Sequence, residues 1–269
     1  MRKLIALAVI CTTGLVFAAV AYAVNSYEVT PASTTGAGGA GTSAKPTGQA
    51  IKFGFTAQDA SGSRATPVKK YSIGFQGLKY FGNKRVFPRC TYAKTNQKLE
   101  SDVKKDCGKA FVGKGVANNR FGPASNPKQD SPCALRLSLY NIGDGFAIRV
   151  DGGNTAKPPT LCPIPVNQAI RGKFRTVRIG GKTSTALVFT LPANLTNPID
   201  QPGRTNDIDN SVSVVNSNIT GKKRKVKIKG KTRRVSILSS TSCGKRRTIQ
   251  VTFTDLNNSA VSAKATTKC

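Results

Sequence analysis

From Ile51 onward the chain consists of short runs in which apolar and polar residues alternate, separated by Gly, Pro, Asn and Asp. A two-residue period places successive side chains on opposite faces of a strand, and clusters of turn residues separate one strand from the next. In the run 134–140, for example, Leu135, Leu137 and Leu139 share one face. The pattern therefore predicts a mostly β protein over residues 51–269.

The alternation marks twelve candidate strands. They are Lys52–Ala57, Tyr71–Phe75, Ala110–Ala117, Ala134–Tyr140, Phe146–Val150, Lys173–Ile179, Thr185–Leu191, Val212–Val215, Lys223–Lys229, Arg233–Leu238, Thr248–Thr254 and Ala260–Ala265. This many short strands indicates a β-sandwich or two stacked β lobes. If there are two lobes, we expect the join in the turn-rich stretch near residues 151–159.

One segment does not follow the strand pattern. Thr91–Asp106 contains no Gly or Pro, and Leu99, Val103 and Cys107 are spaced four residues apart. That spacing puts the three side chains on one face of a helix. We therefore expect one short helix in a disulfide loop, with its end held against Cys90.

The first 23 residues have the features of a secretory signal peptide. Arg2 and Lys3 precede an apolar stretch, Leu4–Val20, and Ala21-Tyr22-Ala23 provides a cleavage site with small residues. An uncleaved membrane anchor is the alternative, because the apolar stretch approaches the length of a membrane span. We expect a secreted or cell-envelope-associated protein that contacts a membrane only through this leader, if it is retained.

The next segment, residues 24–50, has a different composition. Eighteen of the twenty residues from 31 to 50 are Gly, Ala, Ser, Thr or Pro. Such a segment has little apolar surface to bury against the entropy lost on ordering. We therefore expect residues 24–50 to form a flexible low-complexity linker.

Seven cysteines are present, of which Cys11 lies in the expected leader. An even number of cysteines in an exported chain indicates disulfides, and six allow fifteen pairings. Sequential pairing closes the shortest loops and is the pattern we favour. No C-x₂-C spacing occurs, so a zinc site is not expected. The six remaining cysteines are Cys90, Cys107, Cys133, Cys162, Cys243 and Cys269.

The charge and the missing histidine constrain function. The chain has 42 Lys and Arg against 12 Asp and Glu, a formal net charge of +30, and no His. Lack of His excludes Ser-His-Asp and Cys-His catalysis and His-ligated zinc. We expect no catalytic residue, metal or cofactor, and an enzyme that uses other residues is the alternative. The positive charge predicts an anionic partner.

The positive charge is concentrated in residues 221–234, GKKRKVKIKGKTRR. Val226 and Ile228 alternate with lysines, and Gly230-Lys231 can turn the chain into a second strand. We expect a hairpin with one buried face and one strongly cationic face. Its nine basic residues are the candidate anion-binding site: Lys222, Lys223, Arg224, Lys225, Lys227, Lys229, Lys231, Arg233 and Arg234.

These bases predict association with an anionic polymer such as a wall glycan, an acidic lipid surface or an acidic polysaccharide. In the alternative, the protein is a structural or adhesive surface domain whose charge serves solubility, and the lysines only prevent edge-to-edge aggregation. Nucleic acid is disfavoured because the hairpin contains no aromatic residue on which a base could stack.

Several short motifs follow one another in a fixed order. They are Phe87-Pro88-Arg89-Cys90, Cys107 before the run 112–117 (VGKGVA), Leu191-Pro192, and Cys243 with the terminal Cys269. In this order the chain resembles secreted, cysteine-containing β proteins of high-GC Gram-positive bacteria that have no known activity. The resemblance spans most of residues 70–269 and implies export and a β fold. It implies no activity.

The cysteine assignment predicts that the exported protein contains no free thiol. Mass mapping of peptides from unreduced protein should find all six remaining cysteines in disulfides. Two or more free thiols would contradict both the disulfides and the oxidising compartment inferred from them.

Overall fold

The computed structural model describes residues 25–35, 40–96, 99–153, 162, 165–199 and 207–269, with the backbone alone for residues 31–35. The expected signal peptide lies outside these residues. The fold is mostly β, as the alternation predicted, with three short α-helices and one 3₁₀ turn in the described part.

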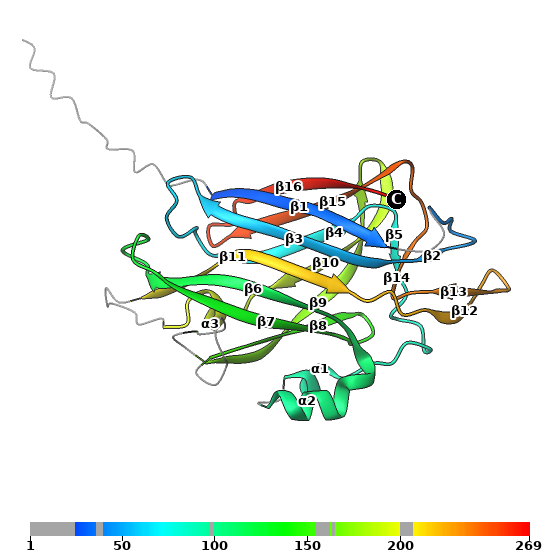
Figure 1. Ribbon diagram of the computed structural model, residues 1–269, viewed down its shortest axis with the longest axis horizontal. Coiled ribbons are helices and arrows are strands. Elements are labelled where there is room, and N and C mark those ends of the chain that lie inside the picture. The colour runs from blue at the N-terminus through cyan, green and yellow to red at the C-terminus, as the bar shows by residue number, and fades with distance from the viewer. Residues whose placement is uncertain (1–24, 36–39, 97–98, 154–161, 163–164, 200–206) are drawn as a thin grey trace, which may run out of the picture.

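Eleven strands form one antiparallel sheet, called here the main sheet (Figure 1). In their order across the sheet they are β1 (Asn25–Thr35), β3 (Ala50–Asp59), β11 (Ile208–Ile219), β6 (Phe111–Pro123), β7 (Ser131–Asn141), β8 (Gly145–Gly152), β9 (Val166–Ile179), β10 (Lys182–Thr190), β4 (Val68–Phe75), β15 (Arg246–Asp255) and β16 (Ala260–Lys268). A small second sheet contains β2 (Thr47–Gly48), β14 (Leu238–Ser240) and β5 (Leu78–Tyr80).

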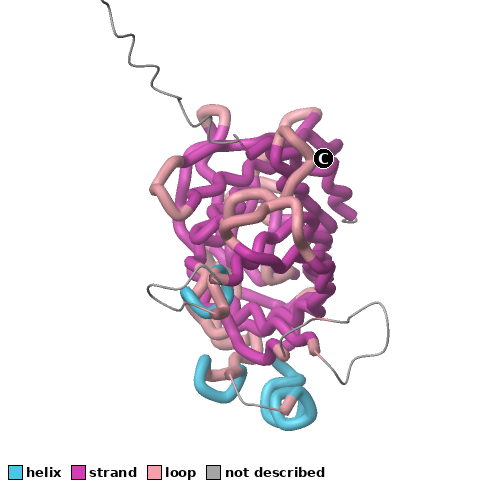
Figure 2. The backbone as a smooth tube through the Cα atoms, turned by 90° about the vertical axis from the view of Figure 1, so that its left-hand side faces the viewer, coloured by secondary structure: helices cyan, strands magenta, loops and turns pink. Residues whose placement is uncertain are grey.

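The main sheet is nearly closed on itself. Its two edge strands, β1 and β16, lie against each other, and the end-on view in Figure 2 shows the strands following a barrel-like outline. The expected β-sandwich or pair of stacked lobes is therefore corrected to a single curled sheet. Strand β8 is buried on both faces and no residue of β16 is buried, but for strands such as β3 and β7 the alternation correctly indicated one buried face. However, it contains no information on whether that face packs against a second sheet or against the far side of the same one.

The expected join between lobes near residues 151–159 falls partly outside the described residues. On either side of it, β8 and β9 pair directly, from Gly145 opposite Lys173 to Gly152 opposite Val166. The connection therefore joins two neighbouring strands of one sheet, and the described residues here contain no boundary between separate sheets.

Strand β1 lies within the segment for which the sequence predicted a flexible linker. It pairs with β3 from Asn25 opposite Asp59 to Thr35 opposite Ala50. The ring of Tyr27 stacks on that of Phe253 in β15, with centroids 4.1 Å apart. The composition argument underestimated this segment, because Ser and Thr are compatible with an extended edge strand and two apolar side chains, Tyr27 and Val29, supply its packing.

The predicted helix is present as two pieces, α1 (Tyr92–Thr95) and α2 (Glu100–Cys107), followed by the 3₁₀ turn η1 (Gly108–Ala110). Val103 and Cys107 are buried as expected, whereas Leu99, at the residue before α2, is 61% exposed. The helices cover the outer face of β7, β8 and β9 with a small apolar cluster. A third helix, α3 (Ala193–Thr196), follows β10. No helix in the described part is long and apolar enough to span a membrane.

All six cysteines pair sequentially, as favoured from the sequence. Cys90 bonds Cys107 beside the helices, and Cys133 on β7 bonds Cys162 in the connection between β8 and β9. Cys243, before β15, bonds Cys269, after β16. The Cα–Cα distances of 5.3, 4.4 and 6.2 Å lie within the range of ordinary disulfides.

The packing of β1 leads to a prediction for Tyr27. Tyr27→Ala should lower the free energy of unfolding by about 2 kcal/mol, because it removes a half-buried ring at the place where the sheet closes. Tyr27→Phe keeps the ring and loses only the hydrogen bond from Asn25 Nδ2 (2.8 Å), so it should change that energy by less than about 1 kcal/mol. Urea unfolding measures both. Equal stability of Tyr27→Ala and the parent would mean that β1 does not pack as described.

Candidate anion-binding surface

The basic segment forms the predicted hairpin. Strands β12 (Arg224–Ile228) and β13 (Lys231–Val235) pair antiparallel and project from one end of the main sheet (Figure 1). The turn residues Lys229 and Gly230 both have positive φ, 48° and 75°. Two such residues make the type I′ turn that suits the twist of a two-residue hairpin. We call residues 222–234 the basic hairpin.

The register of the basic hairpin distributes its charge differently from the prediction. Residues directly opposite each other in an antiparallel pair share a face. Lys225 lies opposite Arg234, and Lys227 opposite Thr232, which makes one face wholly polar. On the other face, however, Val226 lies opposite Arg233, so the expected division into one buried and one cationic face is only partly correct. Val226 and Val235 are buried at the base of the hairpin, whereas bases extend along both faces beyond them.

Eight of the nine predicted basic side chains are exposed, and Arg233 is half-buried. Arg233 donates from Nε to the backbone oxygen of Ala44, 3.3 Å away. The ion pairs formed between described residues include none of the nine. Like charges face each other directly at Lys225 and Arg234, and such a pair destabilises a hairpin unless an anion lies near it.

A cleft of about 620 Å³ lies next to the basic hairpin, between β5 and the hairpin formed by β9 and β10. Its lining includes the bases Lys79, Arg175 and Lys182 together with several Ser and Thr hydroxyls, and none of its described residues is acidic. Ser43, which lines the cleft, precedes Ala44, the residue that binds Arg233. This cleft adds positive charge to the end of the molecule that carries the hairpin.

A wider groove of about 860 Å³ runs over the outer face of β3, β11, β6 and β7, with α2 along one side. Glu100 of α2 forms ion pairs there with Arg136 (2.8 Å) and Lys104 (2.9 Å). Burial alone would raise the pKa of Glu100, but the hydrogen bond from Lys104 and the charge of Arg136 hold that pKa below its ordinary value. Lys52 and Lys114 also line the groove, and both are exposed.

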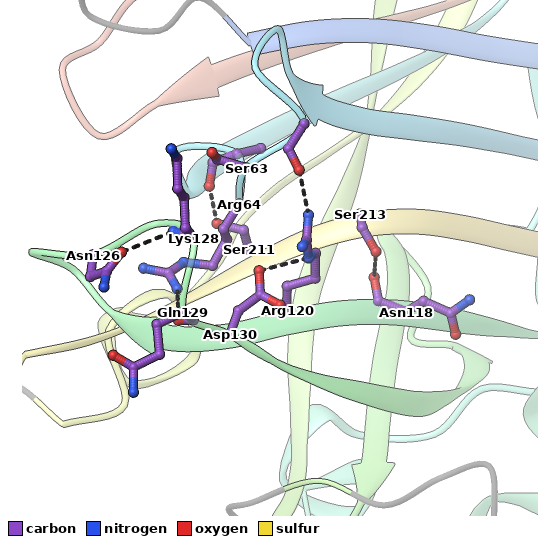
Figure 3. A network of polar contacts seen from close by, with 12 residues as sticks. Ser63, Arg64, Asn118, Arg120, Asn126, Lys128, Gln129, Asp130, Ser211 and Ser213 are labelled. Atoms are coloured by element: carbon purple, nitrogen blue, oxygen red, sulfur yellow. Dashed lines mark hydrogen bonds and ion pairs between the residues drawn. The ribbon is translucent and has the colours of Figure 1, made fainter.

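Two arginines at the opposite end of the sheet have structural partners (Figure 3). Arg120 Nε lies 2.8 Å from a carboxylate oxygen of Asp130, and Arg120 also donates to the backbone oxygen of Gly62. Arg64 is 4% exposed and donates to the backbone oxygens of Pro123 (2.6 Å) and Gln129 (3.3 Å). Burial lowers the pKa of Arg64 below its ordinary value. These bases hold loops together, unlike those of the basic hairpin.

The described residues contain no group of three or more His, Cys, Asp or Glu side chains placed to hold a metal ion. Comparison with known proteins identifies no relative: no protein-family model matches the chain, and no curated protein does so. The resemblance to secreted proteins of high-GC Gram-positive bacteria therefore stays a prediction from the sequence.

Sequence reasoning identified the basic hairpin but neither the cleft nor the groove. The bases of the hairpin all lie within residues 222–234, whereas Lys114 lies 62 positions after Lys52 and Arg136 lies 22 positions after Lys114. Each of the three occupies an outward position in an alternating run, which is the only local signal they carry. Their proximity depends on the order of strands across the sheet, which the sequence pattern does not specify.

The ion pairs of Glu100 predict a pH dependence of stability. In the unfolded chain Glu100 titrates at its ordinary pKa, so on acidification the unfolded state takes up this proton first and the folded state loses stability. Glu100→Gln lacks this titration. Its melting temperature should therefore fall less than that of the parent between pH 7 and pH 3, and it should start lower at pH 7. Parallel pH profiles of the two proteins would show that the ion pairs contribute nothing.

Proposed function

We propose that this chain is an exported, non-catalytic protein that associates with anionic polymers of the cell envelope or the extracellular space through the basic hairpin. The observation that carries the proposal is the set of exposed bases on a projecting hairpin, none of which forms an ion pair with a described residue. A bound polyanion would neutralise the repulsion between bases such as Lys225 and Arg234.

Two further observations support the proposal. The adjacent cleft supplies three more bases and no described acid, so a polymer longer than the hairpin would meet further positive charge. The three disulfides support export, because disulfides persist mainly in oxidising compartments outside the cytoplasm. The leader of basic, apolar and small residues supports the same compartment.

A structural or adhesive domain whose charge serves only solubility is the competing function. In that case the bases of the hairpin would contribute no more to surface association than any other exposed bases. The two functions therefore differ in whether the position of the positive charge matters.

The proposal predicts the effect of removing charge from the polar face of the hairpin. Lys225→Gln/Lys227→Gln/Arg234→Gln should lower the affinity for polyphosphate and for polygalacturonate by about tenfold at low salt. The variant makes fewer contacts with the polyanion, so binding releases fewer counterions. The decline of the logarithm of affinity with the logarithm of NaCl concentration should also become shallower. Titration calorimetry at several NaCl concentrations measures both.

The matched control removes three exposed bases elsewhere, as Lys105→Gln/Lys109→Gln/Lys128→Gln. These residues lie on α2, on η1 and in the loop between β6 and β7, and the ion pairs between described residues do not include them. The control should retain most of the affinity. An equal loss in both variants would favour the solubility role, and an unchanged affinity of the hairpin variant would overturn the proposal.

A further inference from the structure

The groove over β3, β11, β6 and β7 has the composition of a binding site for a charged sugar chain. We propose that it binds an acidic polysaccharide. Lys52 and Lys114 would bind the acid groups of the polymer, and the amides and hydroxyls of the groove floor would form hydrogen bonds with its sugar hydroxyls. This inference deepens the proposed function by naming the class of polymer. It rests on that function only for the additional binding of the same polymer by the basic hairpin.

The groove is built into the sheet rather than left by loose packing. Gly54 on β3 forms part of its floor, between Thr30 on β1 and Asn216 on β11. A Cβ at Gly54 would lie 2.6 Å from Thr30 Oγ1 and 2.7 Å from Asn216 Oδ1, closer than real Cβ atoms approach their neighbours. Glycine at this position leaves the groove unfilled by a side chain, and α2 forms one wall of the groove.

Two lysines lie in one row across the floor. The strand register places Lys52 opposite Asn218, and Asn218 opposite Lys114 on its other side. Neighbouring strands are about 4.8 Å apart, so the two lysine Cα atoms are separated by about 10 Å. Both side chains are exposed, and the ion pairs between described residues include neither. A polymer lying across the strands would therefore meet two positive charges with an amide between them.

The neutral groups of the groove favour a sugar over a bare polyanion. Asn216, Asn218, Ser138 and Thr30 all line it, and amides and hydroxyls both donate and accept hydrogen bonds, as sugar hydroxyls require. Val116 is 42% exposed there and offers an apolar contact for the face of a sugar ring. A single-stranded nucleic acid needs several aromatic platforms, and the described lining outside the buried Phe53 provides one half-buried ring, Phe111.

The groove leads toward the basic hairpin. β11 ends at Ile219, one residue after Asn218, and the chain enters the basic hairpin at Lys222. Four residues span at most about 14 Å, so the hairpin begins close to the row of lysines. A Cβ at Gly221 would lie 3.1 Å from the nitrogen of Ala50, which places the start of the hairpin beside the start of β3. A polysaccharide that leaves the groove at this end would meet the hairpin.

The test uses the full protein, two groove variants and three probes: polygalacturonate, polyphosphate of matched charge, and a single-stranded DNA oligonucleotide. Lys52→Gln/Lys114→Gln should weaken polygalacturonate binding about tenfold. Asn216→Ala/Asn218→Ala should weaken polygalacturonate binding about threefold or more and leave polyphosphate binding within about twofold, because polyphosphate has no sugar hydroxyls. Lys105→Gln/Lys109→Gln, which removes two exposed bases outside the groove, should change neither.

Three outcomes would overturn the inference. The first is a lysine variant no weaker than the control. The second is an asparagine variant that weakens polyphosphate binding as much as polygalacturonate binding. The third is groove-dependent binding of DNA that is tighter than that of polygalacturonate, which would assign the groove to nucleic acid.

A measurement on the unaltered protein removes the dependence on variants that fold poorly. Bound polygalacturonate should slow acylation of the Lys52 and Lys114 amines at least about threefold relative to Lys105 and Lys109. Equal protection at all four lysines would contradict binding in the groove.

The hairpin variant separates this inference from the proposed function. If the hairpin variant binds more weakly but the groove lysines are not protected, the groove inference is refuted and the proposed function stands. If the groove variants bind more weakly but the hairpin variant does not, the role of the hairpin is refuted and the groove inference stands.

Discussion

The register of the main sheet is the constraint on which the rest of the structure depends. Because side chains alternate between the two faces of a strand, the register that buries Phe53 and Phe55 also sends Lys52 outward, and the same pairing aligns it with Asn218 and Lys114. A slip of one residue would bring these lysines into an apolar interior without partners, at a large cost in free energy. The core and the cationic outer surface are therefore two results of the same pattern of backbone hydrogen bonds.

Features encoded by neighbouring residues could be predicted from the sequence. The sequential disulfides, the helix beside Cys90–Cys107 and the basic hairpin all depend on residues close together in the chain, and all are present. The curled sheet could not be predicted, because β3 pairs with β11 across more than 150 residues and alternation says nothing of partners. The groove was missed for the same reason, since Lys52 and Lys114 come into one row only because β11 pairs with β3 on one side and with β6 on the other.

Residues 24–50 illustrate a different limit of composition-based reasoning. Low apolar content favours disorder when a segment must supply its own core. An edge strand needs less, because its partner supplies half of the hydrogen bonds and one or two apolar side chains are enough to anchor it. Tyr27 and Val29 meet this need in β1. Thr47 and Gly48 in β2 likewise pair with Ser239 and Ser240 of β14, within the same Ser- and Gly-rich composition.

The two edges of the main sheet are fastened in different ways. Cys243–Cys269 closes the open end of the β15–β16 hairpin with a covalent bond, whereas β1 is held by backbone hydrogen bonds to β3 and by side-chain contacts such as the Tyr27–Phe253 stack. The molecule is therefore mechanically asymmetric. Under a tensile load, β1 can peel away one hydrogen bond at a time, while β15 and β16 stay joined as a closed loop. Separation of the strands would begin at β1, on one side of the place where the sheet closes, and leave β15 and β16 on the other side joined.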